Sequence, residues 1–366
     1  MSTRLLARLT LACLLLLGFN FGARASYSIL DLGTLGGQFS EARAINNLGQ
    51  VVGAAATSQA LLPFLYSAGQ MISIAPPGTA YGTATSINDV GQVTIHASPI
   101  GGPAIPGRGY LFSQGQLTDI GTLGGSYSSA ISINRHGVVV GDSFLPGDMI
   151  RRGISFSGGT LTDLAPFVVA SDINASGQIV GGTGGKAALY SGGSILDLGT
   201  LGGAVSFAIA INDAGQVVGR AQTGTGQTHA FLYSGGSMTD LGTLGGSFSH
   251  AWDINAVGQV VGSAAKPSLV PGAMPPEVSH AFLYENGTMI DLNTLLPPGS
   301  SFRSLDIAFG INDFGAIAGS GTRLDGSVGA FVLTPVPEPQ THAMLLAGLG
   351  ILCAALRSRN RPAVAL

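Results

Sequence analysis

The chain has 366 residues, of which 57 are glycine and only 10% are charged, whereas about 25% of an average soluble domain is charged. An apolar share of 45% excludes an intrinsically disordered chain, because disorder goes with low hydrophobicity, so the glycines indicate many turns between many short strands. Residues 26–339 hold 10 basic residues against 19 acidic ones, a net charge of −9, which excludes a basic surface for nucleic acid.

The first 25 residues predict a secretory signal peptide. Arg4 and Arg8 form its basic region, an apolar run follows, and Ala23-Arg24-Ala25 is a small-residue cleavage site. We expect signal peptidase to cut between Ala25 and Ser26, so that the mature chain is exported. An uncleaved membrane anchor is the alternative, but the apolar run is short for a span.

A nine-residue motif, I-N-x-x-G-Q-V-V-G, organises the region from residue 26 to residue 335. It recurs seven times with variations, at intervals of 38 to 57 residues, and a period near forty indicates a repeat architecture. Each repeat holds four strand-like segments: one that ends in I-N, then G-Q-V-V-G, A-F-L-Y and x-D-L-G. The asparagines of the motif are Asn46, Asn88, Asn134, Asn174, Asn212, Asn255 and Asn312.

The joints between these segments carry turn residues. N-x-x-G joins the first segment to the second and is typical of a type I turn followed by a glycine in the left-handed region. A pair such as Gly235-Gly236 joins the third segment to the fourth and is typical of a two-residue hairpin. Each repeat is therefore predicted to be a four-stranded antiparallel meander.

The phase of the chain ends predicts how the meanders assemble. Residues 27–33 are a fourth segment without a preceding third, and residues 330–333 are a third segment without a following fourth. Pairing of these two strands would close a ring, so we predict an all-β fold, a seven-bladed β-propeller of four-stranded antiparallel blades. A β-solenoid or a pair of β-sandwiches is the alternative, although an open solenoid gains nothing from this offset.

The first segment of each repeat is predicted to be the innermost strand. In the repeat that contains Ile254, Ala251 and Asp253 stand three residues and one residue before the isoleucine, and mostly small residues recur at both positions. Strand alternation would place both positions on one crowded inner face. It would place Trp252 and Phe309 on the opposite face, where Trp252 is expected to be buried between blades; the alternative is that Trp252 stacks on a sugar at the binding face.

The repeated polar residues form no recognisable catalytic or metal site. G-T-L-G-G occurs four times without the Lys-Ser/Thr of a phosphate loop, so a tight connection between blades is expected. The histidines show no metal-binding spacing, and the aspartates of the turns and fourth segments recur too regularly for a single active site. We therefore predict no cofactor, no metal and no enzyme activity. Four unrepeated acids could supply paired carboxylates, but no motif joins them: Asp172, Asp253, Glu277 and Asp306.

The connections between the second and third segments differ in length and composition, at residues 96–108, 142–152, 220–228 and 263–279. Up-and-down alternation places them on one side of the ring together with the connections between repeats, and we call this side the variable-loop face. Variable loops on a rigid scaffold are where binding usually occurs. The candidate binding residues are Arg108, Arg151, Arg152, Trp252, Lys266 and Glu277.

Residues 336–366 predict a C-terminal sorting tail. We expect an apolar helix over residues 343–356 that inserts transiently into the membrane and is cut off on delivery, since a stable span needs about 20 residues. The alternative is a membrane anchor that keeps its basic residues on the cytoplasmic side. The residues of the signal are Val336, Pro337, Glu338, Pro339, Arg357, Arg359 and Arg361.

Two resemblances accompany these segments. The tail, with Pro337-Glu338-Pro339, resembles the PEP-CTERM signal of Gram-negative bacteria, which implies processing by an exosortase-like enzyme. His229-Ala230-Phe231 and His280-Ala281-Phe282, among D-L-G-T-L-G-G segments, resemble the HAF extracellular repeat from about residue 31 to about residue 331. The HAF resemblance implies a secreted or surface protein, and it implies no reaction.

The sequence thus predicts a non-enzymatic protein of the cell surface, outer envelope or extracellular biofilm matrix, with a binding or structural role. The expected partner is an exopolysaccharide or a surface protein, and nucleic acid is not expected. Two alternatives stay open. One is a polysaccharide lyase or hydrolase that uses the variable-loop face, and the other is a purely structural protein without a ligand.

Overall fold

The computed structural model describes residues 26–99, 107–267, 277–336 and 348. Ser28–Thr334 forms one compact unit, and the account below concerns this unit alone. The predicted signal peptide lies outside the described residues, and so does the predicted apolar helix 343–356 apart from Gly348. The described part of the chain holds no helix with the length and apolar character of a membrane span.

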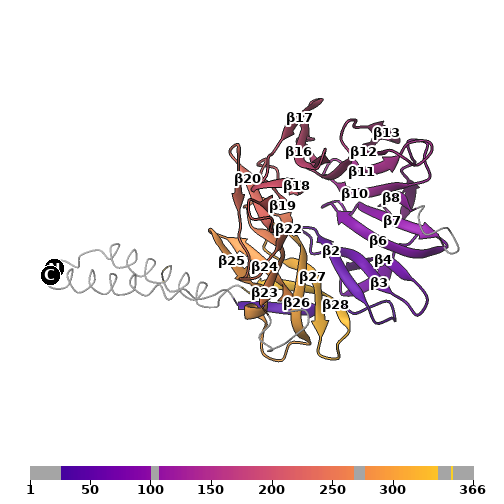
Figure 1. Cartoon of the computed structure of the whole chain (residues 1–366). Coiled ribbons are helices and arrows are strands. Elements are labelled where there is room, and N and C mark those ends of the chain that lie inside the picture. Colours follow the sequence, from indigo (N-terminus) through magenta and orange to yellow (C-terminus); the bar gives the residue numbers. More distant parts are fainter. Residues whose placement is uncertain (1–25, 100–106, 268–276, 337–347, 349–366) are drawn as a thin grey trace, which may run out of the picture. The chain divides into compact units, whose positions relative to one another are not determined.

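The predicted all-β class is confirmed for the described residues, which form 28 strands and one short 3₁₀ helix, η1 (Leu292–Leu295). Five sheets hold four strands each and a sixth holds eight. The eight-stranded sheet consists of two meanders that touch through one parallel pair, Leu61 with Tyr81. Figure 1 shows the first strands of the meanders around the centre of the unit, with last strands such as β13, β17 and β25 at its periphery.

Consecutive strands of each meander pair antiparallel, as predicted. The first two meanders are β2 (Ser40–Ile45), β3 (Val51–Ala56), β4 (Leu61–Ser67), β5 (Gln70–Ser73) and β6 (Thr79–Ile87), β7 (Val93–Pro99), β8 (Arg108–Ser113), β9 (Gln116–Asp119). The next two are β10 (Ser128–Ile133), β11 (Val139–Phe144), β12 (Arg151–Ser157), β13 (Thr160–Asp163) and β14 (Val169–Ile173), β15 (Ile179–Thr183), β16 (Lys186–Ser191), β17 (Ser194–Asp197). Two more are β18 (Gly202–Ile211), β19 (Val217–Thr223), β20 (Thr228–Ser234), β21 (Ser237–Asp240) and β22 (Ser249–Ile254), β23 (Val260–Pro267), β24 (Glu277–Glu285), β25 (Thr288–Asp291).

The remaining sheet joins the two ends of the unit. Its strand order is β1-β28-β27-β26, so the first strand of the chain lies beside the last. This is the N-to-C pairing that the phase of the segments predicts. The bounds are β1 (Ser26–Asp31), β26 (Phe302–Ile311), β27 (Ile317–Arg323) and β28 (Val328–Val336).

The motif asparagine links each repeat to the next. Asn255 is buried, its Nδ2 donates to the backbone oxygen of Asn312 at 3.1 Å, and its Oδ1 accepts from the backbone nitrogen of Gln259 at 2.9 Å. The same inter-repeat bond, 3.0 to 3.2 Å long, leaves each of the other six asparagines, and that of Asn312 returns to the oxygen of Asn46. A buried amide must find partners, so the repeated Asn has an architectural cause.

Glycine is required in the repeats for two different reasons, a positive φ at turns and a close approach between strands. Gly258 has φ of 84° and ends the predicted turn, whereas both residues of Gly235-Gly236 have positive φ, as a two-residue hairpin of this type requires. Gly262 has an ordinary φ, but a Cβ there would lie 2.0 Å from the backbone oxygen of His250 on β22. The close approach arises where β22 carries a bulge, with the register shift between Ala251 and Asp253.

This bulge occurs in every first strand of the seven repeats and overturns the predicted alternation. An extra residue restarts the alternation, so Ala251 is fully buried while Trp252 and Asp253 both line a central cavity. The expectation that Trp252 is buried between blades is therefore wrong. The bulged residues are Arg43, Thr85, Ile131, Ser171, Ile209, Trp252 and Phe309.

The hydrophobic core lies between neighbouring sheets rather than at the centre. Ile254 and Phe282 of one sheet share a cluster with Val218 and Leu241 of the sheet before it. The phenylalanine of A-F-L-Y is fully buried in four repeats, and burying such a side chain contributes about 1.5–3 kcal/mol. These residues are Phe64, Phe231, Phe282 and Phe331.

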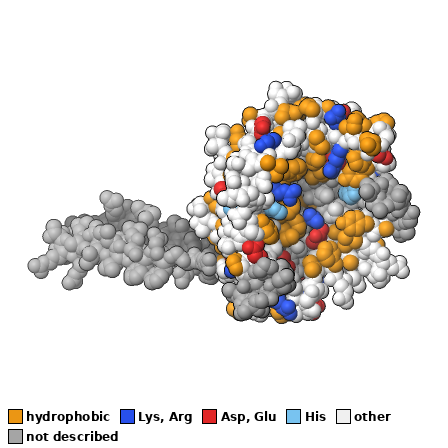
Figure 2. All heavy atoms as spheres, in the orientation of Figure 1, with side chains coloured by type: hydrophobic (Ala, Val, Ile, Leu, Met, Phe, Trp, Pro, Cys, Tyr) orange, Lys and Arg blue, Asp and Glu red, His pale blue; other side chains and the backbone are white. Residues whose placement is uncertain are grey.

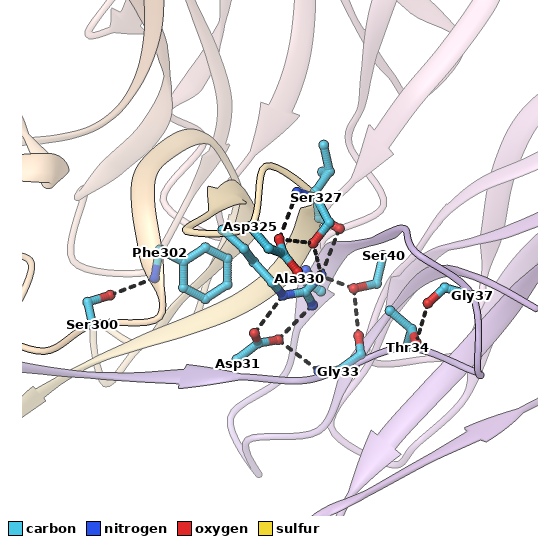
Figure 3. Close-up of polar contacts among 12 residues, drawn as sticks. Asp31, Gly33, Thr34, Gly37, Ser40, Ser300, Phe302, Asp325, Ser327 and Ala330 are labelled. Carbon is cyan, nitrogen blue, oxygen red and sulfur yellow. Dashed lines mark hydrogen bonds and ion pairs between the residues drawn. The ribbon is translucent and has the colours of Figure 1, made fainter.

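G-T-L-G-G is a connection between repeats, as predicted. Between β21 and β22, Ser249 donates to the oxygen of Gly242 at 2.5 Å and accepts from the nitrogen of Ala230 at 2.8 Å. At the junction of the chain ends, Ser40 makes the equivalent bonds to Gly33 at 2.6 Å and Ala330 at 2.9 Å (Figure 3). The first and last repeats are thus joined by the chemistry that joins internal repeats.

Candidate functional site

The fourth-segment aspartates are structural, and they explain the histidine of H-A-F. Asp240 accepts from the nitrogen of Gly242 and lies 2.8 Å from Nδ1 of His229, while Asp291 lies 2.9 Å from Nδ1 of His280. Both pairs are 11 residues apart, because the hairpin between the third and fourth strands places those positions side by side.

At the junction of the chain ends, Arg323 takes the place of the histidine. Its guanidinium donates to both oxygens of Asp31, at 2.6 and 2.8 Å. Burial alone would raise the pKa of Asp31, but the hydrogen bonds from Arg323 and Gly33 outweigh it and lower the pKa. A charge-assisted pair of this kind fixes orientation as well as adding energy.

The predicted residues of the variable-loop face do not form one site. Arg108 pairs with Asp119 at 3.0 Å, and Arg151 with the buried Asp142. Lys266 pairs with Asp291 at 2.8 Å.

The other three predicted residues are also apart from one another. Glu277 accepts from Ser247 at 2.7 Å, and Nε of Arg152 is buried without a hydrogen-bond partner among the described residues. Only Trp252 lines the central cavity. The role of these residues in binding stays a prediction.

The central cavity has a volume of about 440 Å3, within the range of about 300–1,000 Å3 typical of small-molecule sites. It lies inside the first strands, and Figure 2 shows hydrophobic side chains with Lys and Arg among them towards the middle of the face in view. Its walls are made by the bulged residues, their neighbours on the same strands, and Arg220 of β19. All seven bulged positions line it, and they carry six residue types, isoleucine twice, in otherwise repeated surroundings.

One half of the wall is aromatic and basic. The rings of Trp252 and Phe309 are 5.4 Å apart, and Arg43 stacks over Phe309 at 4.3 Å. Arg220 lies 5.9 Å from the ring of Phe207. Arg43 forms an ion pair with Glu41 at 2.7 Å. Arg220, in contrast, is exposed and has no hydrogen bond or ion pair with any described residue.

The other half of the wall is rich in hydroxyl groups, supplied by β6, β10 and β14. Thr85 donates to the oxygen of Ala130 at 2.8 Å, and Ser132 donates to Asp172 at 2.6 Å. The hydroxyl residues of the wall are Thr83, Thr85, Ser86, Ser132 and Ser171.

Two of the four unrepeated acids meet in this cavity. Oδ2 of Asp172 accepts from the nitrogen of Ile211 at 2.8 Å, and Oδ2 of Asp253 accepts from that of Ile311 at 2.9 Å, so each carboxyl also links two repeats. Burial raises the pKa of Asp172 to about 6. Burial, with the charge of Asp172 adding to it, raises the pKa of Asp253 to about 7.

A second cavity of about 250 Å3 lies at the N-x-x-G turns. The turn aspartates that line it are engaged, since Asp89 accepts from Asn47 at 2.9 Å and Asp313 from Ala256 at 2.9 Å. No group of three or more His, Cys, Asp or Glu residues in the described part of the chain could hold a metal ion. The central cavity is therefore the candidate functional site.

One feature of the sequence does indicate this cavity, although simple strand alternation does not predict it. In the pattern A-x-s-I-N, where s is mostly small, the residue x alone differs freely from repeat to repeat. A position that varies between fixed neighbours on an inner strand indicates that something other than packing decides it.

The PEP-CTERM protein-sorting motif matches residues 335–360. No curated protein matches the chain. Among solved structures, TolB from Acinetobacter baumannii is similar at 14% identity over 79% of this chain and 81% of that chain, with a TM-score of 0.41. The β-propeller domain of the Trilobed protease from Pyrococcus furiosus follows at 10% identity, 54% and 64% coverage and 0.37. Trypanosoma rangeli sialidase follows at 10% identity, 93% and 64% coverage and 0.40.

These structures share only a distant likeness with the chain. The match to the sorting motif covers only the C-terminal segment of the chain. It indicates a protein that is exported, sorted to the bacterial cell surface and processed by an exosortase-type enzyme.

Proposed function

We propose that the chain is a non-enzymatic binding protein of the Gram-negative cell surface or extracellular matrix, built from HAF repeats as a closed seven-bladed β-propeller. The ligand enters from the variable-loop face and is held in the central cavity. The observation that carries this proposal is the set of six different residue types at the seven equivalent bulged positions, where only Ile131 and Ile209 are alike.

Closure of the ring is supported by three independent sets of contacts. The sheet order places β1 beside β28. Asn312 donates to the oxygen of Asn46, and Ser40 bridges Gly33 and Ala330, with the geometry found between internal repeats. A closed ring leaves no exposed sheet edge between the first and last repeats.

A binding role is supported by how the repeated polar groups are used. The motif asparagines, the turn aspartates Asp89 and Asp313, and Asp240 of a fourth strand all bond within the scaffold. The bulged residues, which do not follow the repeat, converge in the central cavity instead. Such convergence of aromatic and polar groups in a concave site is typical of ligand binding.

Two measurements test this function. Replacing Pro337, Glu338 and Pro339 with alanine should remove the protein from the cell surface, as seen by fractionation of the native host. The exported protein, immobilised, should retain polysaccharide or protein from the host envelope. Retention of no envelope component by the folded protein would refute the binding role.

Asp172 and Asp253 favour one alternative, a polysaccharide hydrolase or lyase. The pKa of Asp253, raised to about 7, leaves that carboxyl about half protonated near neutral pH beside the mostly ionised Asp172, whose pKa is about 6; an acid catalyst requires such a protonated group. Against this, both oxygens of Asp253 already accept from backbone nitrogens. Turnover of envelope polysaccharide that is abolished by Asp253→Asn would establish the enzyme over the binding protein.

A further inference from the structure

The central cavity is asymmetric although the scaffold around it is repetitive. Its aromatic and basic half comes from β2, β18, β19, β22 and β26, and its hydroxyl half from β6, β10 and β14. If these side chains only filled the space between the first strands, any side chains of suitable volume would do. Instead, aromatic and basic groups lie on one side of the cavity and hydroxyl groups on the other. The division indicates a ligand with one apolar side and one side that carries hydroxyl groups.

The aromatic half offers flat stacking surfaces. Trp252 packs against Phe309 at 5.4 Å and edge-on to His250 at 6.1 Å, and its Nε1 donates to Ser263 at 3.3 Å, so the indole is held in place. Rigid aromatic side chains lose little conformational entropy on binding. A pyranose ring presents C–H groups on one face, and such a face matches this surface.

Arg220 supplies the charge that selects the ligand. It is exposed, it has no hydrogen bond or ion pair with any described residue, and its guanidinium is placed beside Phe207. Together with Phe207 it also lines an adjoining cavity of about 260 Å3, which includes Gln222 and Thr228 at the variable-loop connection 220–228. A guanidinium in this position can bind a carboxylate through two parallel hydrogen bonds.

The opposite half supplies hydrogen bonds for sugar hydroxyl groups. Ser86, Ser132 and Ser171 face the same space as Asp172 and Asp253. Both carboxyls are partly neutral near pH 7, because burial raises their pKa values. At pH 7 Asp253 is about half ionised and Asp172 is mostly ionised, so the pair adds less negative charge to the cavity than two ordinary aspartates would.

We propose that the central cavity binds a uronic acid residue of an acidic saccharide, with its ring stacked on Trp252 and Phe309, its carboxylate on Arg220 and its hydroxyl groups on the serine side. This assignment rests on the proposed binding function and names the ligand class for that site. An exposed acidic terminus of a glycan and an internal uronate share this chemistry.

The test uses calorimetric titration of the exported protein with three probes: a glucuronic acid trimer, a neutral glucose trimer and the peptide Glu-Glu-Glu. The wild-type protein should bind the uronate trimer at least tenfold more tightly than the neutral trimer. Arg220→Gln keeps two of the three stem methylene groups without the charge and should remove that preference. Arg303→Gln, at an exposed arginine outside the cavity, is the matched control and should leave binding unchanged.

Trp252 is tested by two substitutions, since the larger change could affect folding. Trp252→Ala should weaken binding of both trimers at least tenfold, whereas Trp252→Phe keeps an aromatic surface and should weaken it less. Far-UV circular dichroism checks that each variant is folded. Equal loss in both variants would argue against stacking.

Three outcomes would overturn the assignment: no preference for the uronate, a preference that survives Arg220→Gln, or equal binding of the acidic peptide. Retention of envelope material that is unaffected by both the Arg220 and Trp252 substitutions would refute the cavity site while leaving the binding function standing. Retention of nothing from the envelope would refute both.

Discussion

A comparison of two motif asparagines tests whether the ring is closed in solution. Asn134 and Asn312 are both 6% exposed, and each makes three hydrogen bonds: two accepted from its own turn and one donated at 3.1 Å to the next repeat. Neither has the glutamine that supports most other copies, since Val138 and Ala316 take its place. The two sites differ in one respect, because only the bond of Asn312 joins the last repeat to the first.

Substitution by alanine removes all three bonds. A hydrogen bond contributes about 0.5–1.5 kcal/mol net, so Asn134→Ala should lower the free energy of unfolding by about 2–4 kcal/mol. In a closed ring Asn312→Ala should cost the same. In an open ring the bond to Asn46 is absent, and the cost should be about 1 kcal/mol smaller.

The assay is equilibrium unfolding of the exported protein in guanidinium chloride at pH 7. Trp252, the one tryptophan of the chain, reports on the centre of the unit by fluorescence, and far-UV circular dichroism reports on the strands. Coincident transitions would justify a two-state fit. A cost for Asn312→Ala at least 1 kcal/mol below that for Asn134→Ala would refute the closed ring.

Three further predictions concern single residues. Hydrogen bonds from His280, Lys266 and Asn293 overcome the effect of burial and hold the pKa of Asp291 well below its ordinary value. The contribution of Asp291 to the free energy of unfolding is therefore present above about pH 4 and is lost as pH falls. In urea titrations, Asp291→Ala should cost about 1–2 kcal/mol at pH 7, allowing for solvent screening, and less at pH 3. The pKa values of Asp172 and Asp253 are raised, to about 6 and about 7, so the pH dependence has the opposite sign. The contribution of these carboxyls to stability falls as pH rises from about 4 to about 7. Asp253→Asn should flatten this dependence of Tm on pH, and an unchanged slope would contradict the raised pKa of Asp253. Gly262→Ala should cost about 2–4 kcal/mol, since its Cβ would lie 2.0 Å from the oxygen of His250, whereas Gly224→Ala, with no contact closer than 4.0 Å, should be nearly neutral by thermal unfolding.

Local chemistry made much of the scaffold predictable from the sequence. Turns depend on a few neighbouring residues, so Asn255 to Gly258 and Gly235-Gly236 identified their turn types directly. Because the segments recur, the strand order predicted for one repeat could be applied to the other repeats. The offset of residues 27–33 against 330–333 predicted that β1 lies beside β28, because antiparallel meanders leave one strand at each end without a partner.

The roles of several repeated side chains could not be derived in this way, because their partners are distant in sequence. The partner of Asn312 is 266 residues away, and that of Arg323 is 292 residues away. The pairs His229–Asp240 and His280–Asp291 lie nearer, at a constant separation of 11 residues. That separation is a signal the sequence does contain, once the hairpin register is known.

By itself the sequence determined the strands, the turns and the sorting tail, because each depends on contiguous residues. Only the tertiary structure decided where the functional side chains lie. One bulged residue in each first strand breaks the alternation, which turns Trp252 from the space between sheets to the central cavity and brings Asp172 and Asp253 into the same space. A bulge depends on the close approach of two strands, here at Gly262, and no periodicity along one strand reveals it.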